Sequence, residues 1–162
     1  MTLHNLKTSL CLVLAAVLLT ACGLFKKKEP PPPPGPEPTR VVLEFKASGD
    51  INPNMEGRAS PLVLRIYQLT SYPVFMRADF FSLYDKEEQV LAGKVTGKQE
   101  IIVKPNEKRT VYFETAADTQ AVGVMGLFIK SDGIQWKTVS GIQPHKTTVI
   151  PIQVNGTGLT VR

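Results

Sequence analysis

The feature that most constrains the fold is a series of short runs in which apolar and polar residues alternate, from Arg40 to the end of the chain. This period of two is typical of strands with one buried face. Turn-forming residues separate the runs, and Asn155-Gly156 strongly favours a tight hairpin. The predicted strands are 40–47, 62–69, 99–104, 109–115, 121–130, 134–140, 147–154 and 157–161. Eight strands at this spacing predict an all-β domain over 40–162, a two-sheet antiparallel sandwich with four strands in each sheet.

The period changes to that of a helix within 71–93. Spacings of three or four positions, which bring side chains to one face of a helix, relate Phe75, Asp79, Phe80, Leu83 and Tyr84. This spacing predicts a short amphipathic helix inserted after the second strand. Asp85, followed three positions later by Glu88, predicts the start of a second short helix. We expect the insertion to lay its aromatic side chains on one edge of the sheet, and Trp136 to pack between the sheets.

Residues 1–21 have the pattern of a lipoprotein signal peptide. Lys7 precedes an apolar core of about ten residues, which is too short to span a bilayer, and Leu19-Thr20-Ala21-Cys22 follows as a cleavage site. The pattern resembles a bacterial lipobox, in which Cys22 is acylated and becomes the first mature residue. Gly23, where Asp would retain the protein in the inner membrane, predicts the periplasmic face of the outer membrane. An ordinary secretory cleavage near Cys22 is the alternative.

Residues 22–39 predict a tether between the lipid-bearing Cys22 and the domain. Pro30–Pro34, Pro36 and Pro38 favour an extended polyproline II conformation. At ~3.1 Å per residue this run reaches ~28 Å, which favours a spacer that holds the domain off the membrane. Cys11 leaves with the signal peptide, so the mature domain has no cysteine for a disulfide.

Charge and motif content exclude several classes of function. From Arg40 onward the chain has 15 Lys and Arg against 12 Asp and Glu, and the cations are scattered, which argues against a nucleic-acid partner. The only mature histidine is His145, and no nucleophile, phosphate-loop or zinc motif is present. We therefore expect no enzyme activity, no small-molecule substrate and no cofactor beyond the covalent lipid on Cys22.

The one metal site that we consider from the sequence is a calcium site. Oxygen-bearing side chains alternate through the loop at Asp50, Asn52, Asn54 and Glu56. A calcium loop of the EF-hand kind also needs a glycine at its sixth position and a distant bidentate Glu, and both are missing here. We expect no metal.

The polar segment 48–60, between the first two predicted strands, is the candidate binding site. Its candidate residues are Asn52, Pro53, Asn54, Glu56 and Arg58. Polar loops on apolar strands favour recognition, although a hairpin connection without a role has the same pattern. We expect the polar side chains to project, so that changing them to Ala costs no more than ~0.5 kcal/mol. Arg58 would bind a partner's carboxylate or backbone, or brace the loop by pairing with Asp50 or Glu56.

Two motifs give a family resemblance. The segment from Asn52-Pro53-Asn54 through Gly57 to Leu69, with Phe75 and the run 78–84 after it, resembles the TssJ (SciN-like) outer-membrane lipoproteins of type VI secretion systems. The resemblance implies a transthyretin-like sandwich with a helical addition. It also implies a structural role, in which the loop at Ser48–Ser60 binds the periplasmic region of the inner-membrane subunit TssM, with TssL in the same complex. The alternative function is a periplasmic lipoprotein that binds a small ligand or an envelope polymer.

Overall fold

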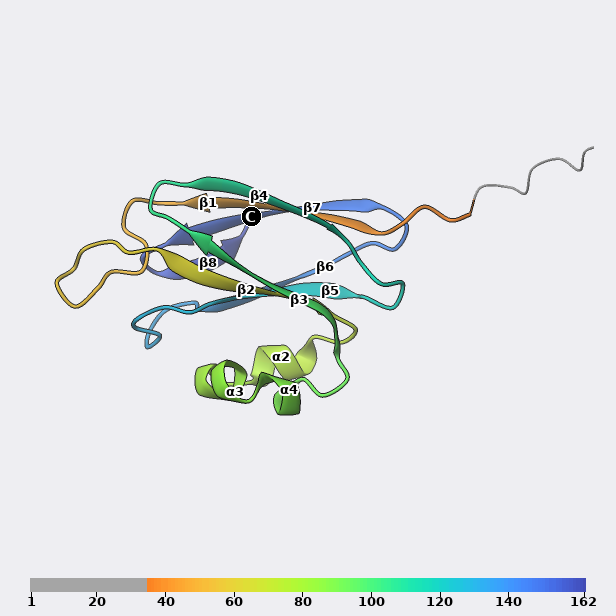
Figure 1. Ribbon diagram of the computed structural model, residues 1–162, viewed down its shortest axis with the longest axis horizontal. Coiled ribbons are helices and arrows are strands. Elements are labelled where there is room, and N and C mark those ends of the chain that lie inside the picture. Colours follow the sequence, from red (N-terminus) through yellow and green to blue (C-terminus); the bar gives the residue numbers. More distant parts are fainter. Residues whose placement is uncertain (1–34) are drawn as a thin grey trace, which may run out of the picture. The chain divides into compact units, whose positions relative to one another are not determined.

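The computed structural model describes residues 35–162, and residues 36–162 form one compact unit. The predicted signal peptide, Cys22 and most of the tether lie outside the described residues. Eight strands make up the unit (Figure 1): β1 (Arg40–Ala47), β2 (Leu62–Leu69), β3 (Val95–Val103), β4 (Lys108–Glu114), β5 (Ala121–Gly126), β6 (Lys137–Gly141), β7 (Thr147–Asn155) and β8 (Gly158–Val161). The prediction of an all-β domain with eight strands is confirmed.

The strands form two four-stranded sheets packed face to face. Sheet A has the order β4-β1-β7-β8 and sheet B has the order β3-β2-β5-β6. All neighbouring strands are antiparallel except β1 and β7, which run parallel from Arg40 opposite Thr147 to Ala47 opposite Val154. The antiparallel prediction therefore holds with one exception. The chain returns from sheet B to sheet A at the end where β1 begins, so β7 runs in the same direction as β1.

Several strand ends differ from the predicted ones. β3 begins at Val95 instead of 99. The residues that follow Val95 alternate in exposure, and β3 is an edge strand that pairs with β2 on one side only, so polar residues can extend it. β5 ends at Gly126 instead of 130, and β6 begins at Lys137 instead of 134. The residues between them leave the sheet and form a long connection.

The main core lies between the two sheets. Leu62, Leu64 and Ile66 of β2 point into it and face alternate residues of sheet A, such as Leu43 and Phe45. All five side chains are at most 2% exposed. This alternation is the one that the sequence predicts, and it places the sandwich core between the sheets.

A second core lies on the outer face of sheet B. Its buried members are Tyr67, Leu69, Phe75, Leu83, Leu91 and Met125. Three short helices cover this face (Figure 1): α2 (Pro73–Arg77), α3 (Phe80–Asp85) and α4 (Glu87–Val90). The prediction that the insertion lies on an edge of the sheet is wrong, because it covers a face and adds a third layer. All six residues of β5 are buried for this reason.

The helical insertion breaks where the spacing predicts one helix. Ala78 is extended, with φ −62° and ψ 141°, and Asp79 caps α3 by accepting a hydrogen bond from Ser82 N at 2.9 Å. Asp85 is the last residue of α3 instead of the start of a helix. α4 begins after Lys86 without a side-chain cap, so the capping-box prediction is wrong.

Trp136 joins the two cores. Its ring meets Phe80 of α3 edge to face, with the centroids 5.2 Å apart, and it packs against both apolar clusters. The buried Lys137 beside it donates through Nζ to the backbone oxygens of Phe75 and Ala78 at the end of α2. Burial lowers the pKa of Lys137. These contacts fix the helical insertion to sheet B.

Candidate functional site

The β1–β2 connection lies at the far end of the sandwich from the residue where the chain enters it. The chain enters sheet A at Arg40, and β1 then runs eight residues, or about 26 Å, before the connection begins. Three other connections lie at the same end (Figure 1). We call this end the distal end, and define it by residues 48–61, 104–107, 127–136 and 155–157.

Backbone hydrogen bonds hold these connections to one another. Ala47 N donates to Glu107 O at 2.9 Å, Asn106 N donates to Ser48 O at 3.2 Å, and Ser48 N donates to Val154 O at 2.9 Å. The Ser48 hydroxyl also donates to the carboxylate of Asp50, which lowers the pKa of Asp50. The start of the β1–β2 connection is therefore anchored to two neighbouring turns.

Asn52 is the residue that fixes the rest of the connection. Its side chain is buried, with 4% of the residue exposed. Its Nδ2 donates to Pro61 O at 2.8 Å, and its Oδ1 accepts from Ile129 N at 2.8 Å. Its φ of 45° lies in the left-handed region, where Asn is several-fold enriched. The prediction that Asn52 projects from the sandwich is wrong, because this side chain joins the β1–β2 and β5–β6 connections.

Asn54 organises the tip of the connection. Its Oδ1 accepts hydrogen bonds from Glu56 N at 3.0 Å and Arg58 N at 2.9 Å. Its backbone N donates to Arg58 O at 2.8 Å, and Gly57, at φ 77°, donates to Asn54 O at 3.0 Å. Asn54 and Pro53 are half-buried. The tip is thus closed by its own hydrogen bonds, and its shape does not depend on a partner.

The side chains that do project are those of Met55, Glu56 and Arg58. Met55 is 81% exposed. Glu56 and Arg58 form an ion pair, with 67% and 75% of their side chains exposed. The sequence alternative in which Arg58 pairs with Glu56 is therefore present, but the pair lies in solvent and such pairs are worth only ~0–1 kcal/mol.

Sequence reasoning missed two exposed apolar side chains at this end. Met55 has a signal in the sequence, because it is an apolar residue inside a polar, turn-rich segment. Ile129 is 51% exposed and follows a buried Phe128, so the alternation places it on the surface only if the strand continues. In the structure β5 ends at Gly126, and Ile129 lies in the connection that follows, where its backbone N–H donates to Asn52.

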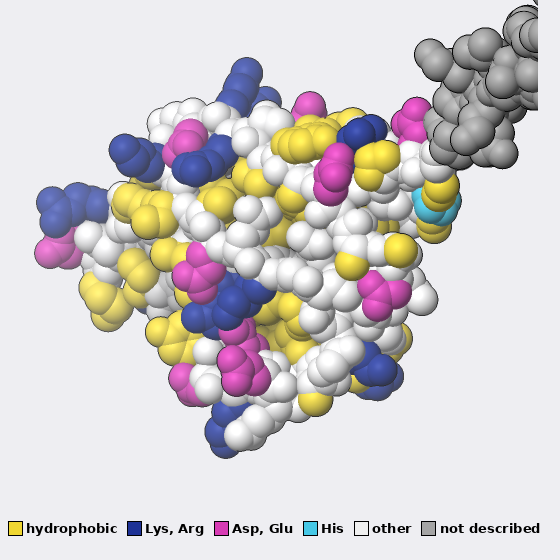
Figure 2. All heavy atoms as spheres, turned by 45° about the vertical axis from the view of Figure 1, so that its right-hand side comes forward, with side chains coloured by type: hydrophobic (Ala, Val, Ile, Leu, Met, Phe, Trp, Pro, Cys, Tyr) yellow, Lys and Arg dark blue, Asp and Glu magenta, His cyan; other side chains and the backbone are white. Residues whose placement is uncertain are grey.

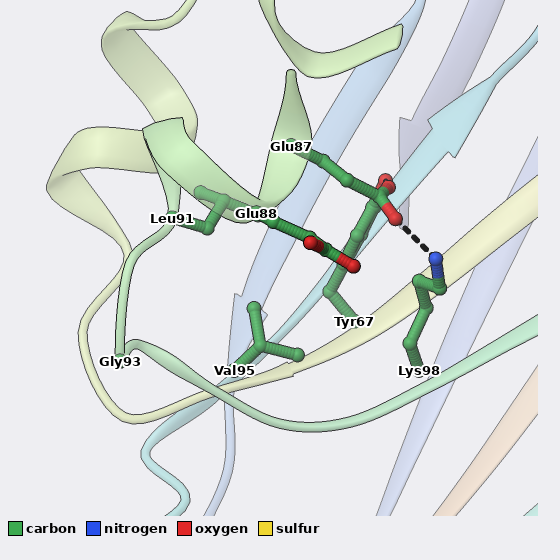
Figure 3. Close-up of a pocket in the computed structure, with 7 residues that line it drawn as sticks. All are labelled: Tyr67, Glu87, Glu88, Leu91, Gly93, Val95 and Lys98. Atoms are coloured by element: carbon green, nitrogen blue, oxygen red, sulfur yellow. Dashed lines mark hydrogen bonds and ion pairs between the residues drawn. The ribbon is translucent and has the colours of Figure 1, made fainter. Parts of the chain in front are cut away.

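A cavity between α4 and sheet B tests the small-ligand alternative. Its volume is about 290 Å³, and Figure 3 shows Tyr67, Glu87 and Lys98 converging on one another at its wall. The Tyr67 hydroxyl donates to Glu87 at 2.6 Å, and Lys98 pairs with the same carboxylate. Burial would raise the pKa of Glu87, but the hydrogen bonds from Lys98 and Tyr67 outweigh it and lower that pKa.

This polar network braces the insertion. Arg65 joins it, pairing with Glu100 of the neighbouring strand and with Glu87 at 3.4 Å, and donating to Tyr84 O at 3.1 Å. The polar groups that converge at the cavity wall therefore bind one another instead of facing a space that a small ligand would fill. Among residues 35–162 no cluster of His, Cys, Asp or Glu has a metal-binding arrangement. In the same residues no helix has the length and apolar character needed to cross a membrane.

The fold and the site together define a class of protein: a two-sheet β-sandwich with a helical layer on one sheet and a preorganised loop at its distal end. Residues 39–157 match the family model described as "Type VI secretion lipoprotein, VasD, EvfM, TssJ, VC_A0113". The chain belongs to this family of type VI secretion lipoproteins, and the resemblance that the sequence motifs indicate is confirmed.

Solved structures support the same assignment. The lipoprotein TssJ1 of the Pseudomonas aeruginosa type VI secretion system matches with a TM-score of 0.73 and 29% identity, over 77% of this chain and 95% of that chain. Serratia marcescens Lip, a membrane-bound component of the type VI secretion system, matches with a TM-score of 0.71 over 77% and 98%, and its 23% identity shows the fold alone.

A third match is to a chain of the structure titled "T6SS protein TssM C-terminal domain (869-1107) from EAEC". Its TM-score is 0.65 and its identity 25%, over 76% of this chain and 98% of that chain. A comparison with curated protein sequences finds no match.

Proposed function

We propose that this chain is the outer-membrane structural lipoprotein of a type VI secretion membrane complex, and that its distal end binds the periplasmic region of TssM, with TssL in the same complex. Acylation of Cys22 would anchor it, as the lipoprotein family and the lipobox pattern support. Gly23 supports the periplasmic face of the outer membrane as its location. Residues 1–21 would then be the signal peptide and 22–39 the tether.

The observation that carries this proposal is the rigid loop at the distal end. The tether joins the sandwich at Arg40, so the β1–β2 connection points away from the attachment point. Asn52 and Asn54 fix its shape through four hydrogen bonds before any partner arrives. A preorganised loop loses less conformational entropy on binding, which favours affinity. The similarity to a chain of a structure titled for a type VI secretion protein supports a place in the same machine, and TssM as the partner is what the family resemblance implies.

The site residues divide into two roles under this proposal. Asn52, Pro53 and Asn54 shape the loop, whereas Glu56 and Arg58 contact the partner. Arg58 would exchange its exposed pairing with Glu56 for a carboxylate or backbone oxygens of TssM, because its planar guanidinium binds two oxygens at once. Anchors of this kind are often worth ~2 kcal/mol or more.

Titration calorimetry with the purified periplasmic region of TssM tests the proposal. We expect the parent chain to bind, and Arg58→Ala to weaken binding about 30-fold, which corresponds to ~2 kcal/mol at 1.4 kcal/mol per factor of ten. The melting temperature of Arg58→Ala should stay near that of the parent, because an exposed ion pair contributes little to stability.

Lys94→Ala is the matched control, since Lys94 is an exposed cation just before β3, at the end opposite to the loop. It should bind TssM as the parent does. Absence of binding by the parent would refute TssM as the partner. Parent-like binding by the double variant Asn54→Ala and Arg58→Ala would instead show that the β1–β2 connection is not the interface.

A further inference from the structure

The outer face of sheet A differs from that of sheet B because no helix of residues 35–162 covers it (Figure 1). The strand register places its outward side chains in rows that cross β4, β1 and β7. Two of these rows have an unusual composition for a solvent-facing sheet, one apolar and one cationic.

The apolar row consists of Tyr112, Val42 and Val149, which lie opposite one another on the three strands. Tyr112 is 57% exposed and Val149 is 53% exposed. The row lies two residues from Arg40, where the chain coming from the tether enters the sheet. Exposed apolar residues in a contiguous row often mark a contact surface.

The cationic row lies four residues further along β1. Lys46 and Lys108 are direct partners in the β1–β4 register, an arrangement of like charges that destabilises a sheet. Arg162 lines the same shallow hollow of about 330 Å³, together with Lys46, Lys108 and Glu44. Within the described residues none of these three cations has an ion pair, whereas Arg40 and Arg65 pair with Glu114 and Glu100.

Figure 2 shows several Lys and Arg side chains at the upper left of the molecule, with acidic side chains next to some of them. Repulsion between adjacent lysines costs stability in the isolated domain. A negatively charged surface placed against this face would remove that cost.

We propose that the outer face of sheet A rests on the anionic surface of the bilayer that holds the lipid anchor. An anionic membrane surface attracts each Lys or Arg side chain near it, and several such side chains together favour binding to the membrane. Tyrosine is enriched at the membrane interface, where Tyr112 would lie. The proposal rests on acylation of Cys22 and is independent of TssM binding.

The tether makes this contact geometrically possible. The part of the tether after Cys22, residues 23–39, joins the sandwich at Arg40, two residues from the apolar row. The tether limits how far the domain can move from the headgroups, which raises the effective concentration of this face there and lets it come to rest on them. The helical layer on sheet B would face the periplasm, and the distal loops would stay accessible to a partner at the side of the domain.

Fluorescence quenching in vesicles tests the proposal with the full lipidated mature chain. The mature chain has no cysteine besides Cys22, so Thr110→Cys places a single label on this face, between Lys108 and Tyr112 of β4. Gln89→Cys, exposed on α4, places a matched label on the opposite layer. Vesicles of phosphatidylethanolamine and phosphatidylglycerol with a headgroup quencher are compared with vesicles of phosphatidylcholine and the same quencher.

We expect strong quenching at position 110 and weak quenching at position 89, only in the anionic vesicles. Raising the salt concentration should reduce it, because screening shortens the range of the attraction. The double variant Lys46→Glu and Lys108→Glu should lower the ratio of docked to undocked chain at least tenfold. Lys108→Glu alone creates an opposite-charge pair with Lys46, so its melting temperature should not fall and unfolding cannot explain a loss of docking.

Equal quenching at positions 110 and 89 would overturn the proposal, as would quenching in anionic vesicles that survives the double charge reversal. If the reversal instead weakened binding to the TssM periplasmic region and left quenching unchanged, the face would bind protein and the membrane contact would be wrong.

Discussion

Asn52→Ala tests whether Asn52 stabilises the fold through its buried side chain or is only an exposed loop residue. The change removes two hydrogen bonds of 2.8 Å made by a side chain that is 4% exposed. Each is worth ~0.5–1.5 kcal/mol, and more if its partner is left buried and unsatisfied. Alanine must also adopt φ 45°, which costs about 1 kcal/mol because its Cβ disfavours the left-handed region.

Together these effects predict a loss of about 3 kcal/mol in the free energy of unfolding. For a domain of this size the melting temperature should fall by roughly 10 °C. This exceeds several-fold the ~0.5 kcal/mol expected when Asn52 is taken as an exposed residue. Urea and thermal denaturation of the domain from residue 36 onward would measure both quantities.

Two companion variants divide the loss into its causes. Asn52→Gly removes the same hydrogen bonds but accepts a positive φ, so it should be about 1 kcal/mol less destabilising than Asn52→Ala. Asn54→Ala loses hydrogen bonds to backbone groups at the exposed loop tip, where water replaces them, and should cost about 1 kcal/mol or less. If Asn52→Ala unfolded within 0.5 kcal/mol of the parent, the claim that Asn52 locks the two connections would be wrong.

Three further predictions follow from other parts of the chain. Cys22→Ser should abolish incorporation of a palmitate analogue in labelled cells, because serine offers no thiol for thioether lipidation, and parent-like labelling would refute the anchor. The pKa of Glu87 is lower in the folded state than its ordinary value of 4.5, so its contribution to stability is present above that pH and is lost as the pH falls below it; Glu87→Gln should flatten the acid limb of the stability curve, and Glu88→Gln, which changes a carboxylate without an ion pair among the described residues, should leave it unchanged. Gly158→Ala should destabilise the domain by about 3 kcal/mol, because φ is 121° and a Cβ would overlap the backbone oxygen of Gln135; Gly141→Ala, where no heavy atom comes closer than 4.0 Å, serves as the control in chemical denaturation.

Local pattern was sufficient to predict that the chain has eight strands, although not the bounds of every strand. Alternation along 40–47 and 62–69 predicted β1 and β2 with their observed bounds, because the side chains of a strand face its two sides in turn whatever its neighbours are. The signal peptide pattern and the family motifs are equally local. The position of the candidate loop was therefore available from the sequence.

Tertiary structure decided what the loop residues do. Asn52 is buried because Ile129, 77 positions away, brings its backbone N–H to the side chain, and no local pattern reports a partner at that separation. The parallel pairing of β1 with β7 and the meeting of Lys46 with Lys108 are of the same kind. Period and propensity act over a few residues, whereas strand order and loop contacts depend on which distant segments bury each other's surface. For that reason the sequence predicts that this loop is polar and exposed at its tip, and only the fold shows which of its side chains are left to meet a partner.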